Sequence, residues 1–330
     1  MKRSSRLSVA VVQGGPSTEA AVSRASALGV ATALERAGHE VVRLEIDAFL
    51  AESLRSGGYD VVFPAVHGAV GEDGSLQGLL EILELPYVGS GLLASALAMD
   101  KRVARIVFAH AGLAIAEAMT FARGGAGAAP AAAERALRSL GPRLVVKPSS
   151  QGSAIGVTRF EQDASTSDVA HAIEAAWALD EIALVEDFVL GREVTCGVLD
   201  TESLLPLPPT EIVSPSDAFY SYRARYVPGR SVHICPAGLS AGTTRVVQEV
   251  ALAAHRALGC RDLSRVDFVV GEDAVTLLEV NTLPGMTATS LYPEAAAAAG
   301  LSMTQLCDAL VRHAHARGAT ARLPAVPLPR

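Results

Sequence analysis

Cysteines are few in this chain, and no apolar run is long enough to cross a membrane. The four cysteines of the 330 residues are far apart and form no C-x-x-C pair: Cys196, Cys235, Cys260 and Cys307. This spacing is typical of reduced, mostly buried thiols and argues against a disulfide or zinc framework. No apolar stretch approaches the roughly 20 residues of a membrane helix, and the apolar run behind the short basic start is too brief for a secretory signal. We therefore expect a cytoplasmic protein with no membrane contact.

Positive charge is not in excess either. The net charge is −7, and charged residues make up 19% of the chain. Bulk electrostatics of this sign do not draw a protein to nucleic acid, so no nucleic-acid partner is expected. Half of the residues are hydrophobic, which together with the length indicates a globular protein of two or three domains.

The first part of the chain alternates predicted strands and helices. Apolar runs at 7–13, 40–46 and 59–66 predict strands, and the Ala-rich stretch 19–37, which ends at Gly38, predicts a helix. The order strand, helix, strand is typical of a parallel sheet. The expected fold class is therefore α/β, with a parallel, Rossmann-like arrangement at the amino-terminal end.

Later segments are less regular. The Gly/Ala-rich stretch 122–133 is interpreted as a mobile surface connection, and the proline-rich stretch 203–238 as a long loop with a functional role. Further strands are predicted at 85–88, 144–147 and 182–188, and further helices at 77–83, from about 98 to Gly112, at 243–258 and at 302–316.

Residues 265–281 give the strongest sign of a site, because they predict an antiparallel strand pair. Side chains alternate along a strand, so Arg265 and Asp267 share one face, and Glu279 and Asn281 share a face of the partner strand. If the register brings these faces together, carboxylate and amide oxygens converge, and these are ligands that Mg²⁺ prefers. The alternative is a surface ladder of salt bridges. The apolar flanks favour a metal site, because unpaired carboxylates in buried strands are costly.

Three other segments suit a nucleotide. Lys147 ends a predicted strand, and the Ser/Gly-rich loop 148–156 that follows can place backbone N–H groups around phosphate oxygens, although the P-loop motif is absent. Lys101, at a predicted helix start, is a second candidate cation, but a single lysine is usually a solvated surface charge. The segment 186–193 can place Glu193 near a ribose.

Three further residue positions suit a small substrate. The turn at Gly285, in the loop that follows Asn281, exposes backbone N–H groups that can hold a carboxylate or an oxyanion, although an ordinary loop is the alternative. Glu19 lies in the first turn of a predicted helix and can receive an ammonium group. His67 ends the third predicted strand, at the edge where parallel sheets bind ligands. Each residue alone is more often structural, so the interpretation depends on their meeting in space.

In order, these segments resemble the D-alanine–D-alanine ligases of the ATP-grasp superfamily. The matching stretches cover nearly the whole chain: 14–23, 67–78, 86–90, 99–101, 146–153, 186–193, 220–226, 235–237 and 265–291. The resemblance implies a three-domain ATP-grasp architecture. It consists of an amino-terminal α/β substrate-binding domain (1–97), a central subdomain (98–190), and a carboxyl-terminal subdomain (191–330) that contains the metal site and an active-site loop (203–238).

The resemblance also implies a role for each candidate residue. The residues implied to act in catalysis are Glu19, Ser153, Tyr226, Arg265, Gly285 and Ser290, and those implied to bind the amino acids are Glu19, His67, Arg265, Gly285, Ser290 and Leu291. The residues implied to bind ATP are Lys101, Lys147, Ser153, Glu186, Phe188, Val189, Glu193, Phe219 and Arg225. Asp267, Glu279 and Asn281 would hold two Mg²⁺ ions, with Mn²⁺ as a substitute, and a hydrogen-bonded set of Tyr226, Ser153 and Glu19 would close the loop over the site.

The implied reaction joins two D-alanines through an acylphosphate for peptidoglycan precursor synthesis, in a homodimeric enzyme. Three departures from the family pattern, at Ala20-Ala21, Ala154 and Arg225, keep an alternative open: a paralogous ATP-grasp ligase that joins other small amino or hydroxy acids in a biosynthetic or resistance pathway. A catalytically silent nucleotide-binding protein is a second alternative. It is disfavoured because the metal-site residues and Arg265 are all present.

Overall fold

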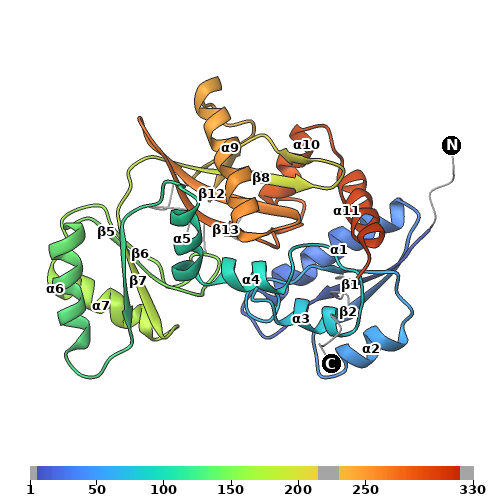
Figure 1. Cartoon of the computed structure of the whole chain (residues 1–330), viewed down its shortest axis with the longest axis horizontal. Helices are drawn as coiled ribbons and strands as arrows, with labels where there is room; N and C mark the ends of the chain where they lie inside the picture. Colours follow the sequence, from blue (N-terminus) through green and yellow to red (C-terminus); the bar gives the residue numbers. More distant parts are fainter. Residues whose placement is uncertain (1–5, 215–229, 320–330) are drawn as a thin grey trace, which may run out of the picture.

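The computed structural model describes residues 6–214 and 230–319. These residues form three β-sheets with their helices, arranged along the long axis of the molecule (Figure 1). A parallel sheet lies at one end, a four-stranded antiparallel sheet lies at the opposite end, and a six-stranded sheet lies between them.

The parallel sheet confirms the predicted α/β start. Its strands are β1 (Ser8–Gln13), β2 (Glu40–Glu45) and β3 (Val61–Pro64), in the order β2-β1-β3, and α1 (Ala20–Arg36) connects the first two. The predicted strand at 85–88 is reduced to a single parallel bridge between Val62 and Tyr87. β1 is almost wholly buried, which fits a strand covered on both faces.

Short helices precede and follow β3 in the chain. They are α2 (Leu50–Ser56), α3 (Ser75–Ile82), α4 (Leu92–Met99) and α5 (Lys101–His110). The sequence predicted one helix from about 98 to Gly112, and that boundary was wrong. Asp100 has an extended backbone and its side chain accepts hydrogen bonds from the N–H groups of Arg102 and Val103, so it ends α4 and begins α5.

The four-stranded sheet has the order β4-β7-β5-β6. Its strands are β4 (Ala118–Ala122), β5 (Leu144–Pro148), β6 (Thr158–Phe160) and β7 (Ile182–Asp187), and its helices are α6 (Ala128–Leu140) and α7 (Thr166–Trp177). The interpretation of 122–133 as a mobile connection was wrong for its second half, because α6 begins at Ala128. Ala129, Ala132, Ala133 and Ala136 are buried on one face of α6, so the alanines form a packing surface.

The six-stranded sheet has the order β11-β10-β8-β12-β13, with β9 paired to β8. Its elements are β8 (Arg192–Asp200), β9 (Leu204–Pro206), β10 (Thr210–Val213), β11 (Val232–Ile234), β12 (Asp262–Val270), β13 (Val275–Asn281) and α9 (Ala241–Leu258). The prediction of one long loop over 203–238 was wrong for the described part of it, which contributes three short strands. β8 was not predicted.

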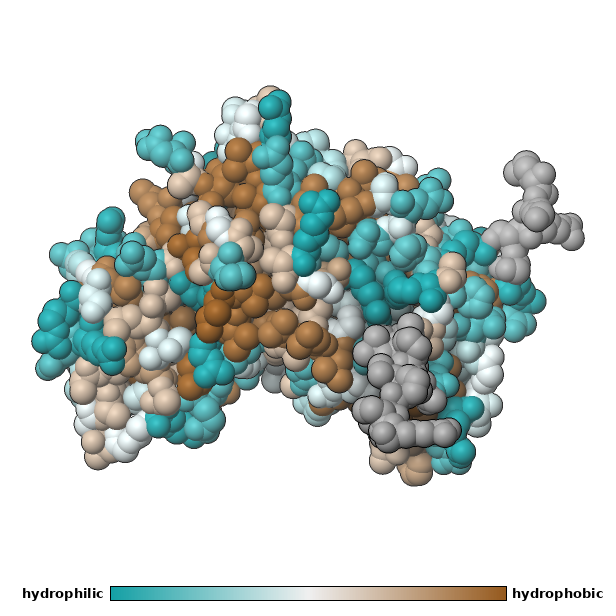
Figure 2. Space-filling view, in the orientation of Figure 1, coloured by the Kyte–Doolittle hydropathy of each residue, from teal (hydrophilic) through white to brown (hydrophobic). Residues whose placement is uncertain are grey.

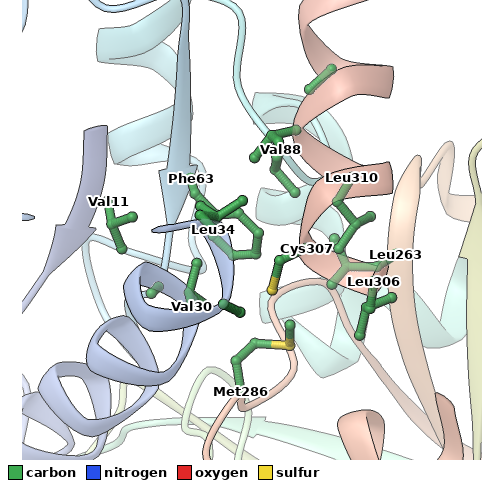
Figure 3. Close-up of a cluster of buried hydrophobic side chains, with 14 of the residues drawn as sticks. Val11, Val30, Leu34, Phe63, Val88, Leu263, Met286, Leu306, Cys307 and Leu310 are labelled. Atoms are coloured by element: carbon green, nitrogen blue, oxygen red, sulfur yellow. The ribbon is translucent and has the colours of Figure 1, made fainter. Parts of the chain in front are cut away.

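The end of the chain packs against its beginning. After α10 (Leu291–Ala298), the last helix α11 (Met303–Arg317) lies against α1. Figure 3 shows this cluster, in which Val30 and Leu34 of α1 face Cys307 and Leu310 of α11, with Met286 alongside. The loop that follows β13 is therefore held against the helix that follows β1.

Three of the four cysteines are buried, as the sequence predicts. The cysteines are free, and burial raises the pKa of the Cys260 thiol to about 11. Within the described ranges, no helix is long and apolar enough to span a bilayer. Figure 2 shows apolar surface over α4 and α5, the helices that carry the exposed side chains of Leu93 and Ile106. Apolar surface of this kind is typical of a contact face.

Candidate active site

The strand pair β12–β13 brings the predicted metal-site residues together. The strands are antiparallel, and the register places Asp267 opposite Glu279 and Arg265 opposite Asn281. The predicted convergence of two carboxylates, an amide and a guanidinium is confirmed.

Both carboxylates of this pair are matched by cations. The Arg265 guanidinium donates two hydrogen bonds of 2.8 Å to Asp267, and Thr195 donates a third to the same carboxylate at 2.7 Å. The Lys101 ammonium lies 3.1 Å from the Glu279 carboxylate. The strand pair is therefore a charged platform on which each carboxylate pairs with a cation.

The donor set fits Mg²⁺. Asp267, Glu279 and Asn281 supply hard oxygen atoms on neighbouring strands. In the part of the chain that the structure describes, no group of three His, Cys, Asp or Glu residues forms a ready-made metal cage. Mg²⁺ takes few ligands from the protein and the rest from phosphates and water, so the three oxygen donors on the strand pair match its needs.

A cavity of about 480 Å³ opens beside this platform. This is a common size for small-molecule sites. Its lining contains the predicted residues Glu19, His67, Lys101, Ser153, Arg265, Glu279, Asn281, Gly285, Ser290 and Leu291. Residues from both ends of the chain thus meet in one space, which we call the substrate cavity.

Glu19 and His67 contribute buried polar groups to the substrate cavity. Glu19, which directly precedes α1, is 5% exposed and its carboxylate accepts a hydrogen bond from the Ser153 hydroxyl. His67 Nε2 lies 3.2 Å from the Ser26 hydroxyl, and its Nδ1 lies 3.7 Å from the Glu72 carboxylate. The role of Glu72 was missed. The sequence did offer a clue, because Glu72 follows His67 by five residues in the same loop.

The loop after β13 also lines the substrate cavity. The Ser290 hydroxyl accepts a hydrogen bond from the Thr287 N–H at 3.0 Å. A Cβ atom at Gly285 would lie 2.8 Å from that hydroxyl, so a side chain there would displace Ser290. Leu291 begins α10 and is buried. The loop is therefore folded tightly, with a residue that lacks a side chain facing the cavity.

A second cavity lies between the four-stranded sheet and the β12–β13 pair. It is lined by the predicted residues Lys101, Lys147, Glu186, Phe188, Val189, Glu193 and Glu279, together with Val269 and Leu278. Lys101 and Glu279 line both cavities, so the two spaces meet at this ion pair. We call this space the inter-sheet cavity.

Buried and partly buried ion pairs lie along the inter-sheet cavity. The Lys147 ammonium lies 2.5 Å from Glu186, which also pairs with Arg105 at 2.8 Å. Arg159 pairs with Glu193 at 2.8 Å, and its guanidinium carbon lies 5.1 Å from the centre of the Phe188 ring. Arg159 was missed, and a single arginine on a three-residue strand offers no sequence signal.

Among the described residues predicted for the site, Asp267 is the exception. Asp267 lines neither cavity among the described residues and instead binds Arg265 from the neighbouring position on the platform. Phe219, Arg225 and Tyr226 lie outside the described residues.

Two antiparallel sheets that face each other across a cavity lined by lysines and acids, joined to a parallel α/β unit, define a three-domain ATP-grasp protein. The family model described as "D-ala D-ala ligase C-terminus" matches residues 107–312, and the model described as "D-ala D-ala ligase N-terminus" matches residues 50–90. The chain belongs to the D-alanine–D-alanine ligase family.

Individual relatives agree over almost the full length. The chain is 43% identical to a D-alanine–D-alanine ligase of Anaeromyxobacter sp. (strain K), over 92% of this chain and 95% of that protein. It is also 43% identical to one of Desulforudis audaxviator, over 94% and 99% of the two chains. The solved D-alanine–D-alanine ligase of Bacillus anthracis, complexed with ATP, is similar in structure with a TM-score of 0.78 and 28% identity, over 93% and 97%.

Proposed function

We propose that the protein catalyses the ATP-dependent joining of two D-alanines to D-alanyl-D-alanine, for peptidoglycan precursor synthesis. The observation that carries this proposal is the meeting of the substrate cavity and the inter-sheet cavity at Lys101 and Glu279. Phosphoryl transfer needs a nucleotide and an acceptor held against each other with their charges neutralised. A nucleotide in one cavity and an acceptor in the other would lie side by side at this junction.

The amino acids would lie in the substrate cavity. Glu19 would receive the ammonium group of the first D-alanine, because it is a buried carboxylate at the cavity wall. Arg265, the Gly285 backbone and Ser290 would hold the second D-alanine and the developing oxyanion. His67 and Leu291 would complete the wall around the two small side chains.

ATP would lie in the inter-sheet cavity, which lysines and acids line. The solved Bacillus anthracis relative is complexed with ATP. Lys101 and Lys147 would bind its phosphates, and the loop of Ser153 would cover them. Glu186, Phe188, Val189 and Glu193 would hold the adenosine, and Phe219 and Arg225 are assigned to ATP from the family resemblance alone.

Asp267, Glu279 and Asn281 would hold two Mg²⁺ ions. Bound Mg²⁺ supplies neutralisation of charge on the transferring phosphoryl group. Lys101 and Arg265, which pair with Glu279 and Asp267, would then turn toward phosphate and carboxylate oxygens.

The reaction has two steps. The carboxylate of the first D-alanine attacks the γ-phosphorus of ATP, which forms an acylphosphate and releases ADP. The free amine of the second D-alanine then attacks the acyl carbon, and inorganic phosphate leaves as the amide forms. Glu19 and Ser153, with Tyr226 as the third member of the set, would keep water from the acylphosphate.

Three broader assignments belong to the same proposal. The division into 1–97, 98–190 and 191–330 follows the succession of the three sheets. A homodimer is proposed from the family resemblance, with the apolar surface over α4 and α5 as its contact face. The proposed compartment is the cytoplasm.

The test is phosphate release from Mg-ATP with D-alanine, with L-alanine, and with D-alanine plus D-lactate, with products identified by mass. Phosphate and a D-alanyl-D-alanine mass from D-alanine alone support the proposal. Measurable ATP binding without turnover of D-alanine would overturn it in favour of a ligase for other small amino or hydroxy acids.

A further inference from the structure

The loop between β5 and β6 has an unfavourable backbone conformation. Ser153 and Ala154 are consecutive residues with φ values of +50° and +56°. Residues other than glycine adopt this left-handed region at an energetic cost, and they stay there only where the surroundings fix them. The loop residues 149–156, which we call the β5–β6 loop, therefore depend on contacts with neighbouring elements.

Asp100 provides the first of these contacts. Its Oδ1 atom accepts hydrogen bonds from the N–H groups of Arg102 and Val103, at 3.0 and 3.3 Å, and so caps α5. The same oxygen accepts a hydrogen bond of 2.7 Å from the hydroxyl of Ser149, which is 1% exposed. One carboxylate oxygen thus joins the start of α5 to the start of the β5–β6 loop.

Lys101 strengthens this connection at two atoms. Its backbone N–H donates to the Ser149 carbonyl at 2.9 Å, and its ammonium donates to the Gln151 carbonyl at 2.7 Å. A second carboxylate holds the loop from the opposite side, because Asp180 accepts a hydrogen bond of 2.6 Å from the Ser150 N–H. The β5–β6 loop is clamped between α5 and the turn before β7.

The carboxylate of Asp100 is ionised at neutral pH. Partial burial alone would raise its pKa, but hydrogen bonds from Ser149 and Arg102 outweigh that effect and hold the pKa below its usual range. A charged acceptor makes stronger hydrogen bonds than a neutral one. Asp100 lines neither the substrate cavity nor the inter-sheet cavity among the described residues, so it acts through its neighbours.

We propose that Asp100 is a positioning residue that fixes Lys101 and the β5–β6 loop as one unit around the phosphates of ATP. This inference rests on the proposed function. Lys101 supplies a cation, and the left-handed backbone at Ser153 and Ala154 supplies the form of concave loop whose N–H groups bind anions. The Asp100–Ser149 hydrogen bond ties the helix start that carries Lys101 to the start of this loop. Asp100 consequently controls affinity for the phosphates and leaves affinity for adenosine unchanged.

The test compares calorimetric binding of Mg-ATP and of adenosine to wild type, Asp100→Ala and Asp100→Asn. Asp100→Ala is expected to bind ATP about tenfold more weakly, the usual scale for loss of a charge-assisted hydrogen bond, with unchanged affinity for adenosine. Asp100→Asn is expected to restore ATP affinity to within about threefold, because the amide oxygen still accepts from Ser149, Arg102 and Val103. In turnover assays, KM for ATP rises in Asp100→Ala and recovers in Asp100→Asn.

Asp168→Ala is the matched control. Asp168 accepts a 2.6 Å hydrogen bond from Ser165 in the capping box at the start of α7, so this variant also removes a carboxylate that supports a helix start. The hydrogen bonds of the Asp168 carboxylate within the described residues are to Ser165, not to the β5–β6 loop, and the ATP affinity of this variant is expected to equal that of wild type. If Asp100→Ala does not fold, Ser149→Ala carries the same test, because it removes the loop's side of the same hydrogen bond.

The positioning role is overturned if wild type binds ATP but Asp100→Ala loses affinity for ATP and for adenosine to the same extent. In that case the ratio of the two affinities stays at its wild-type value. Wild-type protein that binds no ATP overturns the proposed function, and this inference with it. Asp168→Ala that loses ATP affinity as strongly as Asp100→Ala overturns the positioning role as well, since the effect would then follow from any weakened helix start.

Discussion

Lys101 and Glu279 form a 3.1 Å ion pair where the substrate cavity and the inter-sheet cavity meet. Lys101 comes from the first turn of α5 and Glu279 from β13, so the pair joins elements far apart in the chain. Because each residue lines both cavities, a change at either one alters both spaces.

Glu279→Gln is expected to lower turnover by at least ~10²-fold, because it weakens a ligand for the ion that stabilises charge on the phosphoryl group. The measurement is phosphate release at saturating ATP and D-alanine. Glu272→Gln is the matched control, since Glu272 is exposed in the turn of the same strand pair and should keep normal turnover. A near-normal rate for Glu279→Gln would sink the metal assignment.

Glu186→Gln is expected to destabilise the protein by about 3 kcal/mol, because it leaves the buried cations Lys147 and Arg105 without their shared counter-charge. The measurement is urea unfolding followed by circular dichroism. Glu181→Gln is the control: its carboxylate is 78% exposed, and its pair with Arg123 should contribute less than about 1 kcal/mol. Equal stability of the two variants would contradict the buried-pair interpretation.

Gly156→Ala and Gly259→Ala separate backbone strain from lack of space. Both glycines have φ of +71°, but a Cβ at Gly156 would lie 2.5 Å from Leu179 Cδ1, whereas nothing lies within 4 Å at Gly259. Gly259→Ala should cost about 1 kcal/mol from strain alone. Gly156→Ala should cost at least about 1 kcal/mol more through overpacking. The measurement is the unfolding free energy of each variant. A similar loss of stability in the two variants would show that the loop around Gly156 moves to accept the added methyl group.

Asp100 also predicts a pH dependence. Its folded-state pKa is lowered, so its contribution to stability is fully present above the unfolded value of about 3.9 and is lost as pH falls through the folded pKa. The difference in unfolding free energy between wild type and Asp100→Asn should therefore shrink below about pH 4. Asp163→Asn, at an exposed site, should show no such trend. A constant difference down to pH 3 for Asp100→Asn would count against the lowered pKa.

Alternating patterns predicted the elements that carry the site. The period-two arrangement of Arg265, Asp267, Glu279 and Asn281 predicted shared faces, but only the structure fixes the register that joins them. The roles proposed for residues of the inter-sheet cavity and the substrate cavity came mainly from the family resemblance, because lone residues such as Glu19 and His67 have no distinctive spacing.

The elements and the residue that the sequence did not predict each have a physical explanation. α6 was missed because its alanines adjoin a Gly-rich stretch, although alanine has the highest helix propensity. The strands of 203–238 were missed because prolines interrupt them, and they are held by pairing with β8 rather than by their own preference. Arg159 depends on the meeting of β6 with Glu193 of β8, a contact between separate sheets that no local pattern encodes.

The packing of α11 on α1 has a consequence for biosynthesis. A ribosome makes the amino-terminal sheet before α11, so Val30 and Leu34 gain their partners Leu310 and Cys307 only after α11 has emerged (Figure 3). Until then the nascent sheet carries an uncovered apolar face. Met286 packs in the same cluster and its N–H donates to the Ser26 hydroxyl, so the loop after β13 shares this late packing.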